Sequence, residues 1–180
     1  VLARARELSG NVTAGEGYLS EIGLAAAAWT ASWAAILGRG ALLLIDYGFP
    51  RREFYHPQRS EGTLMCHYRH HAHPDPFFLP GLQDITVHVD FTAIAEAGTE
   101  AGLDFLGYTN QATFLLNCGL TDVVARTPAT DAARYLPLAN AVHKLISPAE
   151  MGELFKVIAL GRGIDEPLVG FTAGDQSSKL

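Results

Sequence analysis

The sequence has few features that would tie it to a membrane, a nucleic acid or a disulfide-bonded scaffold. Its 180 residues include two cysteines, Cys66 and Cys118, which lie far apart and without a zinc-type spacing. Such a pair is typical of reduced, buried thiols in a cytoplasmic protein. The apolar run 22–37 is interrupted by Gly38-Arg39-Gly40 before it reaches bilayer-spanning length, and the first residues lack the apolar core of a signal peptide. The formal net charge is −6 and the arginines are scattered, so we expect no membrane span and no nucleic-acid partner.

Glycine pairs are present, but not in the context that phosphate-binding or nucleotide-binding loops require. Such loops connect a strand to the helix that follows it. The pair Gly15 and Gly17 follows no predicted strand, the pair at 38 and 40 precedes one, and the pair at 161 and 163 follows a predicted helix. The serine-nucleophile pattern Gly-x-Ser-x-Gly is absent as well. The sequence therefore predicts neither a dinucleotide-binding loop nor a serine hydrolase.

The segment Gly40–Gly48 (Gly-Ala-Leu-Leu-Leu-Ile-Asp-Tyr-Gly) is an unbroken apolar run between two glycines. It predicts a strand over 41–47 that is buried on both faces, as in a parallel sheet covered by helices. Before it, a helix is predicted to begin at Ser20, which is a suitable N-cap. The apolar face of this helix would comprise Ile22, Ala25, Trp29, Trp33, Ile36 and Leu37. A helix, a short glycine turn and a buried strand form half of a βαβ unit, so the predicted fold class is α/β.

Periodicity and capping signals predict the remaining elements. Residues 1–20 are polar and predict a loop or a hairpin, and the alternating segment Asp84–Phe91 predicts a strand with Ile85, Val87 and Val89 on one face. The next elements would be a helix over Thr92–Ala101 capped by Thr92 or Asp90, a strand over Leu103–Thr109 and a helix over 111–118 capped by Asn110. A further helix would open at Thr127-Pro128 and be kinked at Pro137. The last helix would open at the capping box Ser147–Glu150 and carry Met151, Leu154, Phe155 and Ile158 on one face, and a last strand would cover Leu168–Thr172. These are too few strands for a complete doubly wound sheet.

Two segments stand apart from this α/β core. Residues 49–83 carry three closely spaced prolines, many aromatic residues and five histidines, and they predict an insertion with a functional or partner-binding role. Residues 120–160 predict a helical addition. Four histidines of the insertion could hold a zinc-like ion or form a solvated, substrate-contacting loop. Because their spacing matches no zinc motif, we expect no metal site at His67, His70, His71 and His73.

Polar residues at the end of the central strand are the first candidate site. Ligands of open α/β sheets bind beyond the carboxyl ends of the strands, and Asp46-Tyr47-Gly48 ends this one. Asp46 could accept a hydrogen bond from a substrate amine or guanidinium, with Tyr47 as a wall or a donor. The alternative is an ordinary turn or cap after a strand.

The polar face of the 84–91 segment is the second candidate site. Strand geometry would put Asp84, Thr86, His88 and Asp90 on one face. Carboxylates next to a histidine suit substrate orientation or proton transfer. Spacing alone favours the alternative, a solvated face in which Asp90 caps the next helix.

Four blocks of the sequence together resemble a known family. They are Leu43–Gly48, Gly62–His70, Pro80–Phe91 and Gln111–Leu116, in the family's order and at about its spacing. The pattern Pro-Gly-x-x-Asp-Ile-Thr-x-x-Val-Asp-Phe in the third block is specific. From about Glu21 to the C-terminus the chain resembles the MidA-like family of S-adenosylmethionine-dependent methyltransferases. That family is related to mitochondrial assembly factors of respiratory complex I that methylate an arginine.

This resemblance implies a class I, Rossmann-like methyltransferase fold and S-adenosylmethionine as the cofactor. The family's glycine-rich donor loop and ribose-binding acidic residue would precede Val1. We therefore expect residues 1–180 to be the C-terminal portion of a methyltransferase domain, with the cofactor-binding residues upstream. Half a sheet would leave an open edge, which a homodimer partner could cover.

The resemblance also implies a protein substrate, an arginine side chain of a respiratory complex subunit, whose guanidinium would pair with carboxylates. The catalytic residues would be Asp46, Tyr47 and Asp90, and the substrate-binding residues would be Gly48, His70, Asp84, Thr86, His88 and Gln111. A cytoplasmic location is expected for a bacterial chain and a mitochondrial one for the eukaryotic relatives. Two alternatives stay open: a non-catalytic protein-docking or assembly module that uses the 49–83 insertion, and a metal-dependent hydrolase that uses the histidine cluster.

Overall fold

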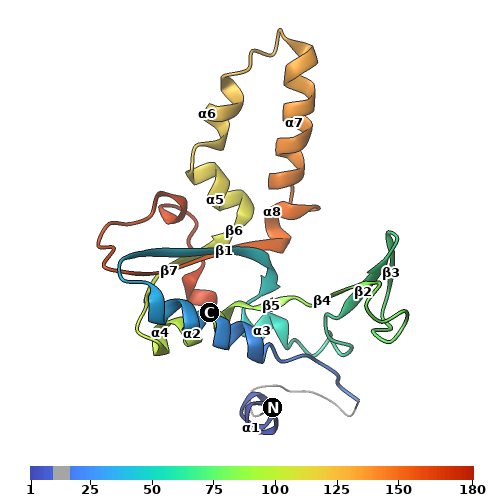
Figure 1. Ribbon diagram of the computed structural model, residues 1–180. Helices are drawn as coiled ribbons and strands as arrows, with labels where there is room; N and C mark the ends of the chain where they lie inside the picture. The colour runs from blue at the N-terminus through green and yellow to red at the C-terminus, as the bar shows by residue number, and fades with distance from the viewer. Residues whose placement is uncertain (10–16) are drawn as a thin grey trace.

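The computed structural model describes residues 1–9 and 17–180, and its largest element is a four-stranded mixed sheet (Figure 1). The strand order is β5-β1-β7-β6, with β7 antiparallel to both of its neighbours and β1 parallel to β5. Three strands therefore run in the same direction and end at the same edge of the sheet. The four strands are β1 (Gly40–Phe49), β5 (Val89–Asp90), β6 (Asp104–Asn110) and β7 (Phe155–Arg162).

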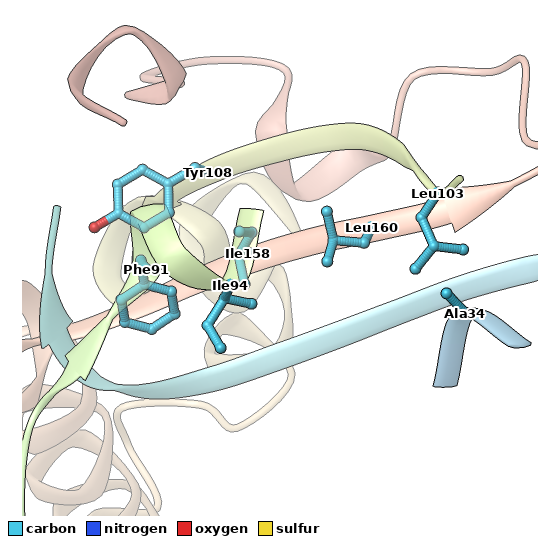
Figure 2. Packing of buried hydrophobic residues seen from close by; sticks show 7 residues of the cluster. All are labelled: Ala34, Phe91, Ile94, Leu103, Tyr108, Ile158 and Leu160. Atoms are coloured by element: carbon cyan, nitrogen blue, oxygen red, sulfur yellow. The ribbon is translucent and has the colours of Figure 1, made fainter. Parts of the chain in front are cut away.

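Two helices, α2 (Leu24–Ile36) and α4 (Phe91–Glu100), pack against each other and cover one face of this sheet (Figure 1). A Cβ atom on Gly98 would lie 2.5 Å from Leu160 Cδ1, so glycine lets α4 approach β7 closely. Each large aliphatic side chain buried here stabilises the fold by about 1.5–3 kcal/mol. Figure 2 shows the side chains of this main core, which are Ala34, Phe91, Ile94, Leu103, Tyr108, Ile158 and Leu160.

The opposite face of the sheet is covered over β6 and β7. There, α5 (Gln111–Asn117) and the 3₁₀ helix η1 (Val169–Phe171) hold a second apolar cluster. Its buried members are Val157, Ala159 and Phe171, with Leu106, Phe114 and Leu168 packed around them. Successive residues of β7 alternate between the two clusters, so β7 is the strand that is buried on both faces.

The segment after β1 forms a small sheet of its own. It follows the short helix α3 (Arg51–Phe54), and its strand order is β3-β2-β4 with both pairings antiparallel. The strands are β2 (Met65–Tyr68), β3 (His71–His73) and β4 (Asp84–Thr86). This sheet lies beyond the end of β1, to the side of the main sheet (Figure 1).

The remaining helices lie at the periphery. In Figure 1, α6 (Leu120–Ala125) and α7 (Ala132–Ile146) project away from the main sheet on the side opposite to α2 and α4. Both helices are fully described, and neither contains a buried residue. The chain returns to the sheet through α8 (Met151–Leu154). At its two ends lie α1 (Leu2–Ser9), which packs Leu8 against Phe54 and Tyr55, and the 3₁₀ helix η2 (Ser177–Lys179).

The predicted α/β class is confirmed, together with the elements that carry a clear cap. β1 contains the predicted strand 41–47, and β6 matches the strand predicted after the glycine at 102. Asp90 caps α4 by accepting a hydrogen bond from Ala93 N at 3.1 Å, and Asn110 caps α5 by accepting one from Thr113 N at 2.8 Å. These signals hold because the side-chain oxygen satisfies an amide that no helical carbonyl can reach.

The helix predicted to open at Ser147–Glu150 is confirmed over α8 (Met151–Leu154) and is wrong beyond it. The helix α8 ends at Leu154, no side chain caps it, and the chain runs on directly as β7. Consequently the expected helical addition 120–160 also contains most of a central strand. The capping-box pattern is local, whereas the pairing of β7 with β1 joins segments far apart in the sequence. That pairing buries the β-branched Val157 and Ile158, which favour a strand.

Burial of β1 on both faces was also predicted wrongly. Exposure alternates along the strand, and Leu43 and Ile45 are 43% and 46% exposed. In the part of the chain that the structure describes, β5 pairs with β1 only at Gly48 and Phe49. The rest of that β1 edge, opposite β7, is therefore open.

The preceding helix departs from prediction in a related way. It begins at Leu24 after Gly23 rather than at Ser20, and no side chain caps it. The buried residues of α2 are Thr30 and Ala34. Trp29, Trp33 and Ile36, predicted to form the buried apolar face, are exposed.

Other predictions fail where tertiary pairing decides the outcome. The segment 84–91 forms two strands in different sheets, and Ile85 and Val87 are exposed. Residues 168–172 contain η1 rather than a strand, and α7 is capped by Asp131 rather than opened at Pro128. Residues 2–9 form α1 instead of a loop, while 10–16 lie outside the described residues. Of the two cysteines, one is buried, as expected, and Cys118 is exposed.

Candidate functional site

A pocket of about 530 Å³ opens where the carboxyl end of β1 meets the small sheet. Because ligands of open α/β sheets bind beyond the carboxyl ends of the strands, this pocket is the expected place for function. We call it the strand-end pocket. Tyr47, His88 and Leu154 line it from the side of the main sheet. The insertion contributes Arg59, Glu61, Thr63, Met65 and His67, among others, and β4 contributes Thr86.

The small sheet turns one of its faces to this pocket. Directly opposed residues of an antiparallel pair project to the same face. Met65 lies opposite Thr86, and His67 lies opposite Asp84. Asp84 therefore shares the pocket-facing side, where the hydroxyl of Thr86 donates to its Oδ2 at 3.2 Å. A carboxylate consequently stands next to the pocket wall.

The main-sheet wall of the pocket is aromatic. The ring of Tyr47 meets those of His88 and Phe155 edge-on, at centroid distances of 5.1 and 5.5 Å. Phe49 stacks on His88 at 5.2 Å with an interplanar angle of 13°. The guanidinium of Arg59 lies 4.1 Å from the centroid of the Phe49 ring, a cation–π contact. These contacts fix the orientation of the imidazole.

His88 is the pocket residue whose protonation the surroundings change most clearly. Burial lowers the pKa of its imidazole, and the positive charge of Arg59 lowers it further, against smaller opposing effects of Glu21 and Asp46. The ring is therefore neutral near pH 7. Its Nδ1 is buried and has no hydrogen-bond partner. A neutral imidazole in the lining of a pocket can accept a hydrogen bond or a proton.

Asp46 lies outside the lining of this pocket. Its carboxylate is exposed, and Oδ1 accepts a hydrogen bond from the amide of Tyr47 at 2.8 Å. Neighbouring residues of a strand point to opposite faces, which sends Asp46 and Tyr47 in different directions. Asp46 thus lies on the face of β1 opposite to Tyr47 rather than in the strand-end pocket.

Asp90 also lies outside the pocket, and its carboxylate has structural partners. Besides capping α4, it pairs with Arg51 at 3.4 Å, and its side chain is 10% exposed. Arg51 in turn binds Glu96 through two hydrogen bonds of 2.6 and 2.5 Å. Burial raises the pKa of Asp90, whereas the bonds from Arg51 lower the pKa of Glu96. Arg51 and Glu96 also line a second pocket, of about 590 Å³, and their charges are already paired with each other.

Three other residues predicted to bind substrate, Gly48, Gln111 and His70, do not line the strand-end pocket. A Cβ atom on Gly48 would lie 2.2 Å from Val89 O, so glycine is needed for β5 to approach β1. Gln111 is buried and donates from Nε2 to Leu145 O at 2.8 Å, which ties α5 to α7. His70 is exposed at the β2–β3 turn, with a φ of 68°. Of the predicted site residues, the structure brings Tyr47, Thr86 and His88 together in one pocket, with Asp84 beside them.

Sequence reasoning missed several pocket residues. Thr63 and Met65 lie in the block 62–70 that carries the family resemblance, so that block was the available signal. His67, in the same block, was considered only as part of the histidine cluster. Arg59 precedes the block, and Leu154 belongs to α8, which was predicted to be part of a longer helix. No local pattern marks these two, because the pocket forms only when α8 docks beside the insertion.

No metal-binding cluster is found within residues 1–9 and 17–180: no three His, Cys, Asp or Glu side chains are placed to hold an ion. The hairpin separates two of the predicted histidines, since His67 faces the pocket while His73 is opposed to Cys66 on the other face. Among the helices of this described part, none has the length and apolarity needed to cross a membrane.

Adenosine-containing ligands of open α/β sheets bind at a glycine-rich turn between a strand and its helix. Here β1 passes to α3 through Pro50, while β5 and β6 run directly into their helices at Phe91 and Gln111. Within 1–9 and 17–180 no strand enters an α-helix through a glycine turn.

Comparison with known proteins places the chain in a family. Residues 2–109 match the model of the family described as "Putative S-adenosyl-L-methionine-dependent methyltransferase". Among curated proteins, the zebrafish (Danio rerio) mitochondrial protein arginine methyltransferase NDUFAF7 is 29% identical over 122 residues, which are 67% of this chain and 27% of that protein.

Two solved structures from Burkholderia thailandensis are closely similar. An uncharacterized protein is 60% identical with a TM-score of 0.96, over 99% of this chain and 48% of its own. A second structure, with S-adenosyl-homocysteine bound, is 60% identical with a TM-score of 0.95, over 99% of this chain and 46% of its own. The predicted Rossmann-like methyltransferase fold is thereby confirmed. The chain spans about half the length of these structures and about a quarter of the curated relative. With a family match over more than half of its residues, the chain belongs to this family of S-adenosyl-L-methionine-dependent methyltransferases.

Proposed function

We propose that this chain forms the acceptor-binding part of an S-adenosylmethionine-dependent methyltransferase, and that the methyl acceptor enters the strand-end pocket. The observation that carries the proposal is the neutral, half-buried imidazole of His88 in the lining of the pocket. A methyl acceptor nitrogen must lose a proton, and a neutral imidazole can receive it. Tyr47 and Phe49 hold the ring in place for that role.

The donor would be held mainly by the part of the family's longer chains that this chain does not span. Two observations support this division. The described residues lack a glycine turn suited to the donor, and the β1 edge along 40–47 is open with Leu43 and Ile45 exposed beside it. A long, apolar, unpaired edge strand is the kind of surface that further strands cover. We propose that the rest of the methyltransferase sheet adds there, with a second copy of the chain as the competing occupant.

The acceptor we propose is an arginine side chain of a protein, as in the name of the zebrafish relative. Glu61 lines the pocket and Asp84 stands beside it. Carboxylates in these places could pair with a guanidinium. The family resemblance further suggests a subunit of a respiratory complex as the substrate protein. The unpaired thiols of Cys66 and Cys118 fit a cytoplasmic location for such an enzyme.

A second candidate function is a docking or assembly module without catalysis. It is favoured by the apolar side chains that the insertion exposes, of which Phe77, Leu82 and Phe78 are the largest in exposed fraction. Exposed apolar patches of this kind often mark interaction sites. The two functions differ in what they require of the pocket: only the methyltransferase needs His88.

The test of the proposed function is a pair of titrations. N-acetyl-arginine amide, added to this chain, should shift the NMR signals of His88 and Tyr47, and His88→Ala should abolish the binding. His71→Ala removes an exposed histidine of the same hairpin and should leave binding unchanged. S-adenosyl-homocysteine should not bind this chain alone. It should bind when this chain is joined to the half of the Burkholderia relative that this chain does not span. Arginine-amide binding that survives His88→Ala would overturn the proposed role of the pocket.

A further inference from the structure

Glu21 lies outside the strand-end pocket, yet its carboxylate binds the turn that forms part of the pocket wall. Its Oε1 accepts hydrogen bonds from the amides of Thr63 at 2.7 Å and Leu64 at 2.6 Å. The hydroxyl of Thr63 lies 3.4 Å from Oε2. The main-chain carbonyl of Glu21 is itself held by the hydroxyl of Tyr55 at 3.1 Å. The carboxylate therefore has a fixed position beneath the turn 62–64.

The turn is shaped around this carboxylate. Gly62 has a φ of +74°, and a Cβ atom there would lie 2.4 Å from Oε1 of Glu21. Successive amides that converge on one anion in a turn with a left-handed residue form a concave binding site for negative charge. Here the anion is a side chain of the protein itself, so the turn and the carboxylate stabilise each other.

A hydrogen-bond relay extends from this turn to the functional histidine. The hydroxyl of Thr63 accepts a hydrogen bond from the amide of His88 at 3.0 Å. Since that hydroxyl also faces Glu21, it links the carboxylate to the main chain of His88. Gly62, Thr63 and Leu64 line the pocket, whereas Glu21 stands behind them. Glu21 could thus set the distance between the two walls of the pocket without touching an acceptor.

We propose that Glu21 is a positioning residue of the acceptor pocket. Its carboxylate fixes the turn 62–64, and through Thr63 it places the main chain of His88, so that the imidazole meets the acceptor at a defined position. The functional part of this inference rests on the proposed function, because it takes the strand-end pocket as the acceptor site. The structural part, the relay from Glu21 to His88, stands independently.

Four variants separate these parts. Glu21→Ala removes the acceptor oxygens, while Glu21→Gln keeps one side-chain oxygen that can accept from both Thr63 and Leu64. Thr63→Val preserves the shape of the side chain and removes the hydroxyl of the relay. Glu100→Ala, at an exposed carboxylate in the last turn of α4, is the matched control. Each is assayed by amide hydrogen exchange of Thr63, Leu64 and His88, and by the affinity for N-acetyl-arginine amide.

With Glu21→Ala, exchange of all three amides should become roughly tenfold to a hundredfold faster, as expected for the loss of a charge-assisted hydrogen bond. Affinity for the arginine amide should fall by about tenfold or more. Glu21→Gln should restore both measurements to near the unmodified values. Thr63→Val should accelerate exchange at His88 and weaken binding, and Glu100→Ala should change neither.

Other results would decide against the proposal. Faster exchange at Thr63 and Leu64 with unchanged exchange at His88 and unchanged affinity would make Glu21 a local anchor only. Glu21→Gln behaving like Glu21→Ala would also overturn it. If Glu21→Ala fails to fold, Glu21→Gln and Thr63→Val give the same decision. If the unmodified chain does not bind the arginine amide while the exchange pattern is as expected, the proposed acceptor is wrong and the relay stands.

Discussion

Substituting Asp90 tests whether its carboxylate acts in chemistry or in structure. The sequence places it in a polar face beside His88, whereas the structure makes it the N-cap of α4 and a partner of Arg51. Asn is as good an N-cap as Asp but carries no charge. Both Asp90→Asn and Asp90→Ala therefore remove the negative charge, but only Asp90→Asn keeps the N-cap.

The expected stability losses follow from these contacts. Removing an N-cap side chain costs about 0.5–2 kcal/mol. Losing a buried ion pair costs about 3–5 kcal/mol when it strands a charge. Arg51 would not be stranded, because two hydrogen bonds still join it to Glu96. We therefore expect Asp90→Ala to lower the free energy of unfolding by about 1–3 kcal/mol and Asp90→Asn by less than about 1 kcal/mol.

Urea unfolding followed by circular dichroism measures these differences. The matched control is Asp131→Ala. It removes the N-cap of α7, where Asp131 accepts a hydrogen bond from Arg134 N, and the site is more exposed and has no buried ion pair. Its loss should lie at the low end of the range for caps. Binding of N-acetyl-arginine amide should be unchanged in Asp90→Asn. A stable Asp90→Asn protein that no longer binds this probe would refute the structural assignment and return Asp90 to the functional site.

Three further substitutions test the fold. Ile158→Ala, in the fully buried centre of β7, should cost about 2–5 kcal/mol in urea unfolding, and a loss below 1 kcal/mol would contradict the assignment of this segment to the core. Gly48→Ala should cost about 1–3 kcal/mol, because its Cβ would meet Val89 O; an unchanged midpoint would mean that β5 does not approach β1 as described. For Glu96, whose pKa is lowered by Arg51, the stabilisation is present above the ordinary carboxyl pKa and is lost as the pH falls. The stability deficit of Glu96→Gln should therefore shrink between about pH 5 and pH 3, and a deficit that stays constant would contradict the ion pair.

The sequence predicts the fold well where a local pattern decides the structure. The caps at Asp90 and Asn110 are local, since each contacts an amide three residues ahead. The position of β7 at the centre of the sheet does not depend on a local pattern. It is a strand because it pairs with β1 on one side and β6 on the other. The pattern Ser147–Glu150 therefore predicted a helix that continues through Ile158, whereas the helix ends at Leu154 and a strand begins at Phe155.

The site shows the same division between local and tertiary information. Tyr47 could be predicted because it lies near the carboxyl end of a recognisable strand, and His88 because it belongs to the polar face of the segment 84–91. Arg59 and Leu154 could not, since they reach the pocket only through the docking of the insertion and α8. Glu21 could not be assigned a role from sequence either, because its partners at Thr63 and Leu64 are forty residues away.

The way each strand joins its helix decides which polar side chains are left without a structural role. β5 and β6 run directly into α4 and α5 without an intervening loop, so the last polar residue of each strand must cap the helix that follows. Asp90 and Asn110 are committed in this way. Groups one or two residues earlier, or on a neighbouring strand end, have no amide to satisfy, and Tyr47 and His88 are such groups. In a sheet that joins its helices this tightly, a polar residue such as His88, two positions before the cap Asp90, is therefore a better candidate for chemistry than the cap itself.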